Sequence, residues 1–202
     1  MDILDIIKKR KSVRKFKSTP VPEGVIAEML EAARHAPSPG NSQGYCFGII
    51  RDKALITRLA EAAGNQMWIA GAPMVVACCG DISWDIARQP EDEFGLKVNK
   101  LRFGEAFVRY MADYPDRDAC MKLFENGAPA LPAQYMFLVA VKHGLGACFV
   151  GYLDVDRASK ILGLPGHIKC LYLLPMGYPD EDRPAKEKKS AEEISFFDRW
   201  GA

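Results

Sequence analysis

The feature that most restricts the fold is a short apolar run, Pro73–Cys79, which is rich in valine and carries no charge. A run of this length and composition predicts a buried strand rather than a helix. Three further segments also read as strands: Tyr45–Ile50, Gly146–Gly151 and Lys169–Leu174. The chain is therefore expected to contain a sheet with at least one buried strand.

Helical patterns alternate with these strands. The clearest is Glu23–His35, in which apolar residues recur every three or four positions. Other helices are expected at Ala54–Ala63, Pro132–His143 and Arg157–Leu162, and a short amphipathic helix is expected from Ile3. Phe103, Phe107, Tyr110 and Met111 fit one face of a further helix. With no internal repeat and no obvious linker, we predict a single domain over residues 1–202. It has a helical insert or lid at about 82–125 and an extension from about 180.

Composition excludes several classes of protein. The 202 residues include 27 Lys and Arg against 26 Asp and Glu, a net charge of +1, which speaks against a general nucleic-acid or anionic-membrane binder. The longest charge-free stretch, Asn126–Val141, has 16 residues and two prolines, short of the roughly 20 apolar residues of a membrane helix. The acidic N-terminal residues do not resemble a secretory signal. We expect a cytoplasmic protein.

Cysteine and histidine spacing gives no metal site. None of the six cysteines forms a Cys-x-x-Cys pair, and the three histidines lie far apart. Five cysteines stand in apolar runs and are expected to be buried, reduced thiols: Cys46, Cys78, Cys79, Cys148 and Cys170.

Seven of the basic residues fall between Lys8 and Lys17. If this stretch is extended, Arg10, Ser12 and Arg14 project to one side and offer donors to a phosphorylated ligand. A solvated surface is the alternative for any basic run. A nucleic-acid patch is a third interpretation, although the stretch has no aromatic residue except Phe16.

Three other segments could contact a ligand. The loop after the Glu23–His35 helix carries Pro37, Ser38, Asn41 and Gln43. The side-chain amides of Asn41 and Gln43 can both donate to and accept from the edge of a heterocycle. The alternative is that these residues only end the helix and form a turn. Glycines flank the segment Gly144–Gly151 and permit close backbone approach to a flat ligand, or simply join a helix to a strand. Lys186 and Lys188 could contact a phosphate or belong to a solvated face.

Together, in this order and spacing, these motifs resemble the nitroreductase family of flavin mononucleotide (FMN) dependent oxidoreductases. The resemblance rests on Arg10-x-Ser12-x-Arg14-x-Phe16, Ala36-Pro37-Ser38 with Asn41 and Gln43, Gly144-Leu145-Gly146 to Gly151, Leu162-Gly163-Leu164-Pro165, Gly177-Tyr178-Pro179 and Lys186-x-Lys188. Three departures are Gly44-Tyr45 in place of Pro-Trp, Lys188 in place of arginine, and prolines 129 and 132 interrupting the helix that leads to Gln134.

The resemblance implies an α+β fold, with a central, mostly antiparallel mixed sheet flanked by helices. The apolar residues near the C-terminus, Phe196, Phe197 and Trp200, are expected to dock either on their own domain or on a partner subunit. The resemblance implies a homodimer with FMN at the interface and a C-terminal tail that wraps the partner subunit. The residues implied to bind FMN are Arg10, Lys11, Ser12, Arg14, Pro37, Ser38, Asn41, Gln43, Val150, Gly151, Lys186 and Lys188. Of these, Ser38, Asn41 and Gln43 would come from the other subunit.

The implied activity is that of an NAD(P)H-dependent flavin oxidoreductase. NADH or NADPH would pass hydride to flavin N5 and leave, and an electron-poor acceptor such as a nitroaromatic or quinone would follow, in a ping-pong mechanism. Other flavin chemistry is an alternative: reductive dehalogenation, or oxidation or reduction of an enone or peptide-like substrate. A non-catalytic basic module that binds nucleic acid is a second alternative. Substrate choice is expected to reside in 82–125, where aromatic residues either cap the flavin or clamp an aromatic acceptor, or else form the core of a helical insert. These residues are Trp84, Phe94, Phe103, Phe107, Tyr110 and Tyr114.

Overall fold

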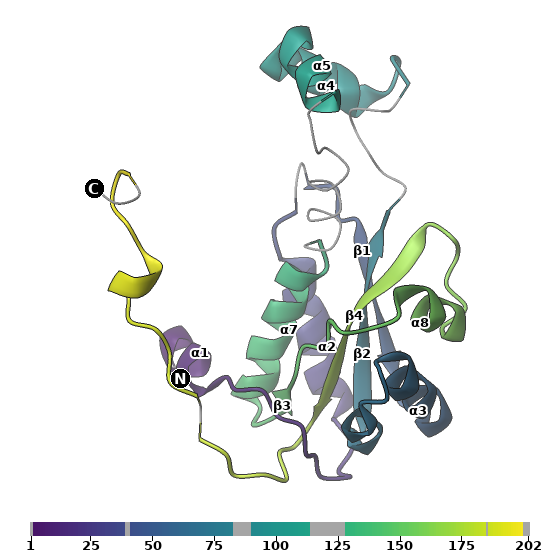
Figure 1. The fold of residues 1–202 in the computed structure, drawn as a ribbon, viewed down its shortest axis with the longest axis vertical. Helices are drawn as coiled ribbons and strands as arrows, with labels where there is room; N and C mark the ends of the chain where they lie inside the picture. The colour runs from purple at the N-terminus through teal and green to yellow at the C-terminus, as the bar shows by residue number, and fades with distance from the viewer. Residues whose placement is uncertain (1, 39–40, 83–89, 114–127, 185, 200–202) are drawn as a thin grey trace.

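The computed structural model describes residues 2–38, 41–82, 90–113, 128–184 and 186–199. A four-stranded antiparallel sheet with strand order β1-β2-β4-β3 lies between two helical layers (Figure 1). The strands are β1 (Tyr45–Ile50), β2 (Met74–Asp81), β3 (Gly146–Ala147) and β4 (Ile168–Gly177). The α-helices are α1 (Ile3–Lys9), α2 (Glu23–Arg34), α3 (Lys53–Ala62), α4 (Phe94–Phe103), α5 (Glu105–Ala112), α7 (Ala130–Lys142) and α8 (Val155–Ile161). Two 3₁₀ turns are η2 (Met67–Gly71) and η4 (Glu192–Ile194). This is the predicted α+β class, except that the only parallel pairing between described residues is a single bridge, Ser12 to Ala147.

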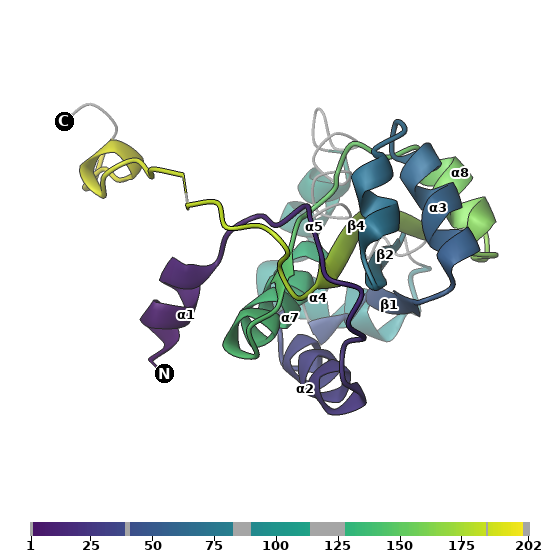
Figure 2. The same cartoon turned by 90° about the horizontal axis from the view of Figure 1, so that it is seen from below.

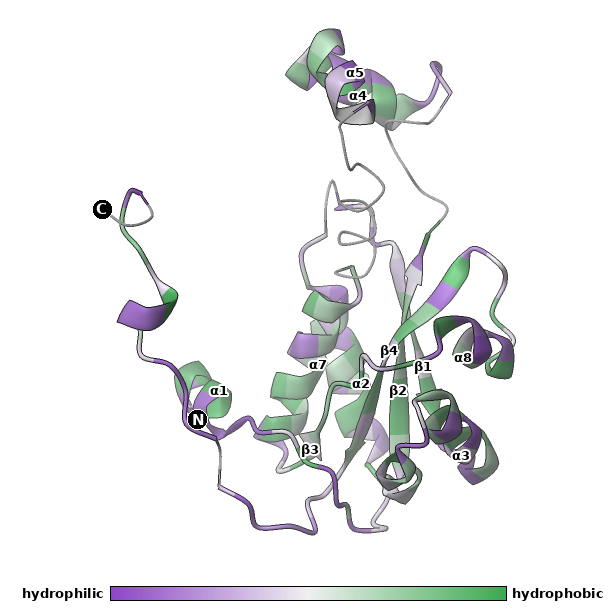
Figure 3. Cartoon of the chain, in the orientation of Figure 1, coloured by the Kyte–Doolittle hydropathy of each residue, from purple (hydrophilic) through white to green (hydrophobic). Residues whose placement is uncertain are grey.

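Strand β2 is buried on both faces, as its apolar run predicted. Met74, Val76 and Cys78 belong to the core cluster under α2 and α7. Val75, Ala77 and Cys79, which alternate with them, belong to the cluster under α3, η2 and α8. Because successive strand residues point to opposite faces, one continuous apolar strand supplies both cores. Figure 3 shows this apolar interior between the two helical layers.

Strand β3 is shorter than predicted, and Pro175 explains the difference. The register of β3 with β4 pairs Gly146 with Gly177 and Ala147 with Met176. At the next position the N–H of Cys148 donates to Pro175 O at 3.3 Å, but Pro175 has no N–H to return the bond. Pairing resumes at Val150, whose N–H donates to Leu173 O at 2.9 Å. The predicted strand Gly146–Gly151 therefore follows β4, but its hydrogen-bond ladder is interrupted.

Two expectations about helices were wrong in detail. Pro129 is the N-cap residue of α7 and Pro132 lies in its first turn, where a helix needs no donor. These prolines therefore begin the helix instead of interrupting it. The aromatic residues of the insert do not share one helix, because Gly104 (φ 82°) separates α4 from α5. Phe103 and Phe107 still face each other across this break, with ring centroids 6.3 Å apart.

Three parts of the chain stand away from the sheet and its two layers. The α4–α5 pair lies beyond one end of the sheet (Figure 1). Helix α1 and the C-terminal segment both project from the body on the same side (Figure 2). All three expose large apolar side chains, including Ile3, Ile7, Phe94, Leu101, Ile194 and Phe197. Among the described residues, no helix is both long and apolar enough to span a bilayer.

The structure corrects one expectation about cysteines. Cys78, Cys79, Cys148 and Cys170 are buried free thiols, as predicted, whereas the free thiol of Cys46 is exposed. The cause is that β1 is the outer strand of the sheet, so one side of it has no neighbouring strand. Cys120 lies outside the described residues.

Candidate flavin site

The basic segment, residues 10–17, is held between β3 and the segment that follows β4. On one side, the N–H of Val13 donates to Ala147 O at 3.0 Å. On the other, the N–H of Lys17 donates to Tyr178 O at 2.9 Å and Phe16 bridges to Pro179. The segment is therefore a fixed, extended part of the fold and not a free basic tail.

Two glycines allow this close packing. A Cβ atom on Gly146 would lie 2.4 Å from Val13 Cγ2. A Cβ atom on Gly177 would lie 2.6 Å from Pro73 Cδ and 3.4 Å from Phe16 Cβ. Both distances to Val13 and Pro73 are well below van der Waals contact, so only glycine fits at positions 146 and 177 without a shift. Two of the glycines in the sequence motifs therefore allow the basic segment to pack closely against β3 and the end of β4.

A carboxylate that sequence reasoning missed, Glu181, also fixes the segment. Its Oε1 accepts a hydrogen bond of 2.7 Å from the backbone N–H of Arg14, and its Oε2 lies 3.0 Å from Arg183 Nε. The hydrogen bond from Arg14, with a smaller contribution from the charge of Arg183, lowers the pKa of Glu181. The signal in the sequence was an acidic residue placed shortly after Gly177-Tyr178-Pro179.

The two arginines of the first motif turn to different neighbours. The Arg10 guanidinium lies over the Phe137 ring of α7, 5.5 Å from its centroid. The Arg14 guanidinium lies over the Trp68 ring of η2 at 5.8 Å. Because α7 and η2 cover opposite faces of the sheet, the two cations are spread along the segment and do not converge on one point. Ser12, between them, is exposed.

The other predicted residues of this half-site lie near the basic segment or on the strand-like stretch that follows β3. Lys11 Nζ donates to Arg183 O at 2.5 Å. Val150 is buried, and both its N–H and its carbonyl are paired with Leu173. Gly151 is exposed, and a Cβ atom there would meet the Tyr172 ring at 3.4 Å. The backbone at positions 150 and 151 is thereby held by β4.

The loop after α2 is organised by its own polar groups. Ser38 Oγ accepts from the N–H of Gln43 at 3.0 Å, and Gln43 Nε2 donates to Asn41 O at 3.2 Å. Asn41 (φ 57°) and Gln43 (φ 50°) are both in the left-handed region, which is unfavourable for residues other than glycine and is often found at ligand sites. Pro37 is exposed.

Within one chain the structure does not bring this loop to the basic segment. Ser12 bridges to Ala147, at the end of the sheet where Ala147 pairs with Met176. The loop leads into Tyr45, which pairs with Gly80 near the opposite end. Helix α2, of 12 residues, runs between the two, a length of about 18 Å. A single copy therefore presents two separate half-sites.

Lys186 and Lys188 belong to the C-terminal segment, which projects from the body (Figure 2) and is described as far as Arg199, so that Trp200 lies outside it. Both are exposed. Farther along this segment, Ile194 and Phe197 are 72% and 86% exposed. The tail therefore does not bury its apolar residues on its own domain, which was one of the two expectations for it.

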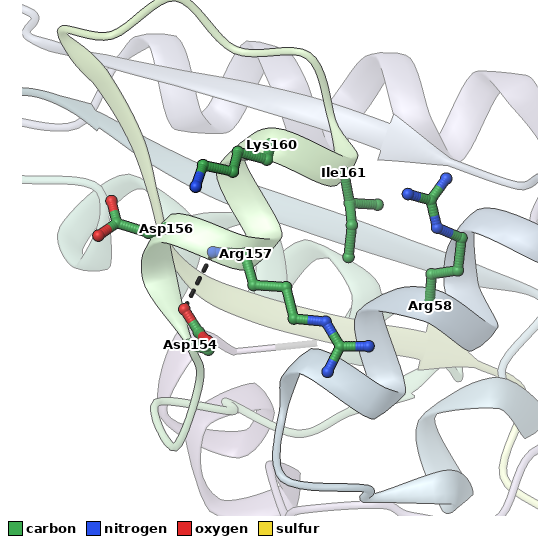
Figure 4. A pocket seen from close by; sticks show the side chains of 6 residues that line it. All are labelled: Arg58, Asp154, Asp156, Arg157, Lys160 and Ile161. Atoms are coloured by element: carbon green, nitrogen blue, oxygen red, sulfur yellow. Dashed lines mark hydrogen bonds between the residues drawn. The ribbon is translucent and has the colours of Figure 1, made fainter.

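Two surface hollows bear on where the candidate site lies. One, of about 240 Å³, lies beside the loop and is lined by Leu30, Ala33, Arg34, Gln43, Tyr45 and Phe47. The other, of about 350 Å³, lies between α3 and α8 and is lined by Arg58, Asp154, Asp156, Arg157, Lys160 and Ile161 (Figure 4).

The hollow between α3 and α8 contains none of the predicted site residues, and most of its charges are already engaged. Asp154 Oδ1 accepts from the N–H of Arg157 at 2.9 Å (Figure 4). The Arg157 side chain pairs with Glu61 at 3.0 Å, and Asp156 pairs with Lys169 at 2.9 Å. The candidate site is therefore the first hollow with its loop, together with the basic segment. In the part of the chain that the structure describes, no group of three His, Cys, Asp or Glu side chains could hold a metal.

Comparisons with known proteins bear on the family and the fold of this chain. The sequence model described as "Nitroreductase family" matches residues 7–178. A protein of Thermus thermophilus named "NADH dehydrogenase" is 32% identical over 174 residues, covering 86% of this chain and 85% of that protein. Among solved structures, an NADPH:FMN oxidoreductase from Vibrio harveyi, complexed with NAD+, aligns with a TM-score of 0.76 at 21% identity, covering 99% of this chain and 78% of that one. An FMN-dependent nitroreductase from Clostridium difficile aligns with a TM-score of 0.71 at 19% identity, covering 98% and 99%.

Proposed function

This chain belongs to the nitroreductase family, and on that premise we propose that it is an FMN-dependent enzyme that works as a homodimer. It is an NAD(P)H-dependent oxidoreductase. The observation that carries the proposal is the separation of its two half-sites. Donors suited to a flavin lie at opposite ends of the sheet of one chain, so a second copy is needed to bring a basic segment next to a loop.

The donor set of each half-site fits a part of FMN. Arg10, Ser12 and Arg14 offer two guanidinium groups and a hydroxyl along a fixed, extended segment, suited to a phosphate and to ring or ribityl oxygens. Lys11, Lys186 and Lys188 add ammonium groups. Lys188 holds a phosphate as a point charge, without the bidentate fork of an arginine.

The loop fits the neutral, polar part of the cofactor. Ser38, Asn41 and Gln43 carry both donors and acceptors and no charge. The left-handed backbone at Asn41 and Gln43 is fixed by hydrogen bonds from Gln43 to Ser38 Oγ and to Asn41 O. We assign these residues and Pro37 to the FMN that the basic segment of the partner subunit holds. The backbone of Val150 and Gly151 lies against the flavin ring in this assignment.

The exposed apolar segments support the dimer. Helix α1 has no buried residue, and the C-terminal tail exposes Ile194, Phe196 and Phe197. Apolar side chains in such number are seldom left in water. We propose that the tail wraps the partner subunit, as expected from the family, and that α1 packs in the same interface.

Bound FMN supplies the redox chemistry, since it accepts hydride from a reduced nicotinamide and returns electrons to an acceptor. The protein's part is to bind, orient and tune it. A cation beside the ring's pyrimidine edge stabilises the negative charge of reduced flavin. Arg10 and Arg14 are the two candidates for this role, and their separation means that only one can lie beside the ring.

The acceptor is proposed to be electron-poor, such as a nitroaromatic or quinone, with the α4–α5 pair selecting it. Phe94, Phe103, Phe107 and Tyr110 are all more than half exposed, so they are not the core of a helical insert, which was the other expectation. Trp84 and Tyr114 lie outside the described residues. Exposed aromatic rings can cover a flavin or clamp an aromatic acceptor.

The nucleic-acid alternative is disfavoured by the pairing of the basic segment with acidic groups. Lys15 Nζ lies 3.1 Å from Asp180, and Glu181 accepts from the backbone of Arg14. A surface that neutralises many phosphates would not place carboxylates along its own basic stretch.

Purified protein tests the proposal. We expect the purified protein to be yellow and to release one FMN per chain on denaturation. In the absence of oxygen, NADH or NADPH should bleach the yellow colour. Steady-state rates with nitroaromatics, quinones, enones and halogenated aromatics would then separate the acceptor classes. Protein that stays colourless and binds no added FMN would show that the proposal is wrong.

A hybrid-dimer experiment tests the shared site. One variant carries Arg10→Ala and Arg14→Ala, and the other carries Asn41→Ala and Gln43→Ala; each alone should bind FMN weakly. Co-expressed and purified as mixed dimers, they should regain one intact site per dimer. Mixed dimers with no better FMN binding than either parent would refute a site built from two subunits.

A further inference from the structure

Three thiols form a row across the sheet. Cys46 on β1 is directly opposite Cys79 on β2, and Cys79 is directly opposite Cys170 on β4. Opposed residues in an antiparallel sheet project from the same face, here the face under α3 and α8. Cys79 is therefore the middle residue, with one thiol-bearing neighbour on each side across the sheet. We call these three residues the thiol row.

The row leads from solvent into the core. Cys46 is exposed on the outer strand, whereas Cys79 is 2% and Cys170 is 0% exposed. A dissolved reagent can therefore meet Cys46 but not the other two. Tyr45 and Phe47 point to the opposite face, so Cys46 lies on the side away from α2 and the proposed flavin loop.

The sheet register sets the spacing of the first pair. Gly44 O accepts from the N–H of Asp81 at 3.0 Å, and these two residues are opposite in the register. Hydrogen-bonded and non-hydrogen-bonded pairs alternate along an antiparallel ladder. Cys46 and Cys79, two positions on, are therefore a hydrogen-bonded pair with Cα atoms about 5.5 Å apart, within the range of about 4.4–6.8 Å that disulfides span.

The second pair lies beside a register shift. The N–H of Ile82 donates to His167 O at 2.9 Å, and the register runs unbroken from there to Cys79, which is opposite Cys170. It then shifts between Cys78 and Cys79, as in a β-bulge, where the local ladder is disrupted, and the N–H of Cys170 donates to Ser159 Oγ at 3.0 Å instead of to the neighbouring strand. Cys79 and Cys170 are still opposed on adjacent strands, the arrangement that thiol exchange between them requires.

We propose that the thiol row is an oxidation site for small disulfides such as oxidised glutathione, which react at Cys46 and pass the oxidation to Cys79. The Cys46 thiolate attacks the reagent, forms a mixed disulfide and releases one small thiol. The neighbouring Cys170 thiol and burial raise the pKa of the Cys79 thiol, so its proton passes to the departing small thiolate as Cys79 attacks Cys46 Sγ, and the second small thiol leaves. Two cysteine thiols lose two electrons, and the reagent's disulfide gains them. Attack of Cys170 on Cys79 can move the bond inward and restore the Cys46 thiol.

The surroundings of Cys46 make this reaction slow at neutral pH and faster in base. Partial burial, with the neighbouring Cys79 thiol and Asp81 carboxylate, raises the pKa of Cys46. The attacking species is the thiolate, so the rate should rise close to tenfold per pH unit below that pKa. The site responds to sustained oxidising conditions rather than to a brief pulse.

The test uses reduced, native, FMN-loaded protein incubated with oxidised glutathione at pH 7 and pH 8. Free thiols are then alkylated under denaturing conditions, and peptides are mapped by mass spectrometry. We expect a mixed disulfide at Cys46 first, followed by a Cys46–Cys79 or Cys79–Cys170 bond. Native protein in which Cys79 remains fully reduced, or in which Cys46 instead links to Cys120, would overturn the proposal.

Matched variants locate the point of attack. Cys46→Ser should slow every bond to Cys79 by at least about tenfold, because no other thiol of the row is exposed. Cys78→Ala, adjacent in the chain but on the opposite face, should leave the rate unchanged. If Cys46→Ser protein oxidises Cys79 as fast as the parent, the oxidation does not begin at Cys46 and the proposal is wrong.

Discussion

Glu181 accepts a 2.7 Å hydrogen bond from the backbone N–H of Arg14, and it comes from a segment more than 160 residues away in the chain. Its side chain is only 10% exposed, although Arg14 itself lies at the surface. Asp180, its neighbour, also meets the basic segment, but through a more exposed pair with Lys15. One carboxylate thus fixes the backbone that carries the proposed flavin cations, while the next one lies at the surface.

Replacing Glu181 should therefore loosen the basic segment. Glu181→Ala leaves the Arg14 N–H without its partner and should lower the free energy of unfolding by about 1–3 kcal/mol. FMN affinity should fall with it. Asp180→Ala is the matched control, since an exposed ion pair contributes about 0–1 kcal/mol. Denaturant unfolding and fluorescence titration with FMN measure both effects, and equal effects of the two substitutions would contradict the assigned role of Glu181.

The same contact predicts a pH dependence. The pKa of Glu181 is lowered in the folded protein, so its contribution is complete above the unfolded value of about 4.3 and is lost as pH falls through the folded pKa. The stability difference between the parent and Glu181→Gln should be constant near neutral pH and shrink in acid. Thermal unfolding from pH 7 to pH 3 measures it. A difference that stays constant across this range would be inconsistent with a role for the charged form.

Removing both flavin-site arginines should weaken FMN binding strongly. Arg10→Ala with Arg14→Ala removes two guanidinium groups, and lost charge-assisted hydrogen bonds cost about 1.5–3 kcal/mol each. Lys17→Ala is the control, because it removes an exposed cation from the same segment while its backbone bond to Tyr178 stays. Equilibrium dialysis at low FMN compares them. Full stoichiometry in the double variant would show that the site was placed wrongly.

Replacing two glycines by alanine should change the stability of the protein in opposite directions. Gly146→Ala puts a Cβ atom 2.4 Å from Val13 Cγ2, and because Val13 is buried, relief requires the basic segment to move. We expect a loss of about 1–3 kcal/mol of stability and weaker FMN binding. Gly24→Ala, in α2 with nothing within 4 Å, should instead gain about 0.5–1 kcal/mol. If Gly146→Ala unfolds and binds FMN like the parent, the close packing at Val13 is not required.

The sequence predicted the elements whose signals are local. The spacing of Val25, Ile26 and Met29 predicted α2 to within one residue of its end, and the apolar run around Val75 predicted β2. What it missed depends on partners distant in the chain. The break in β3 comes from Pro175 on the opposite strand, and the role of Glu181 comes from Arg14. The exposure of Cys46 follows from strand order, which no local pattern contains.

The candidate site was predictable only as a set of segments. Arg10, Ser12 and Arg14 fell on an extended stretch, as their alternation indicated, but aromatic rings on two faces of the sheet draw the two guanidinium groups apart. Likewise, nothing local says that the loop of Asn41 and the segment of Ser12 lie at opposite ends of the sheet. That separation depends on the sheet register, and the proposal of a site shared by two subunits is based on it.

Truncating the tail should separate dimer formation from flavin contacts. Ending the chain after Lys189 removes Ile194, Phe196 and Phe197, which are exposed in the single chain, and keeps Lys186 and Lys188. Burial of each such side chain contributes about 1.5–3 kcal/mol, and every 1.4 kcal/mol is tenfold in affinity, so the dimer should dissociate at least about tenfold more readily. Ile194→Ser with Phe197→Ser should act in the same direction, whereas Glu192→Ser should not. Sedimentation velocity across a dilution series measures this, and a truncated chain that remains as dimeric as the parent refutes the wrapping tail.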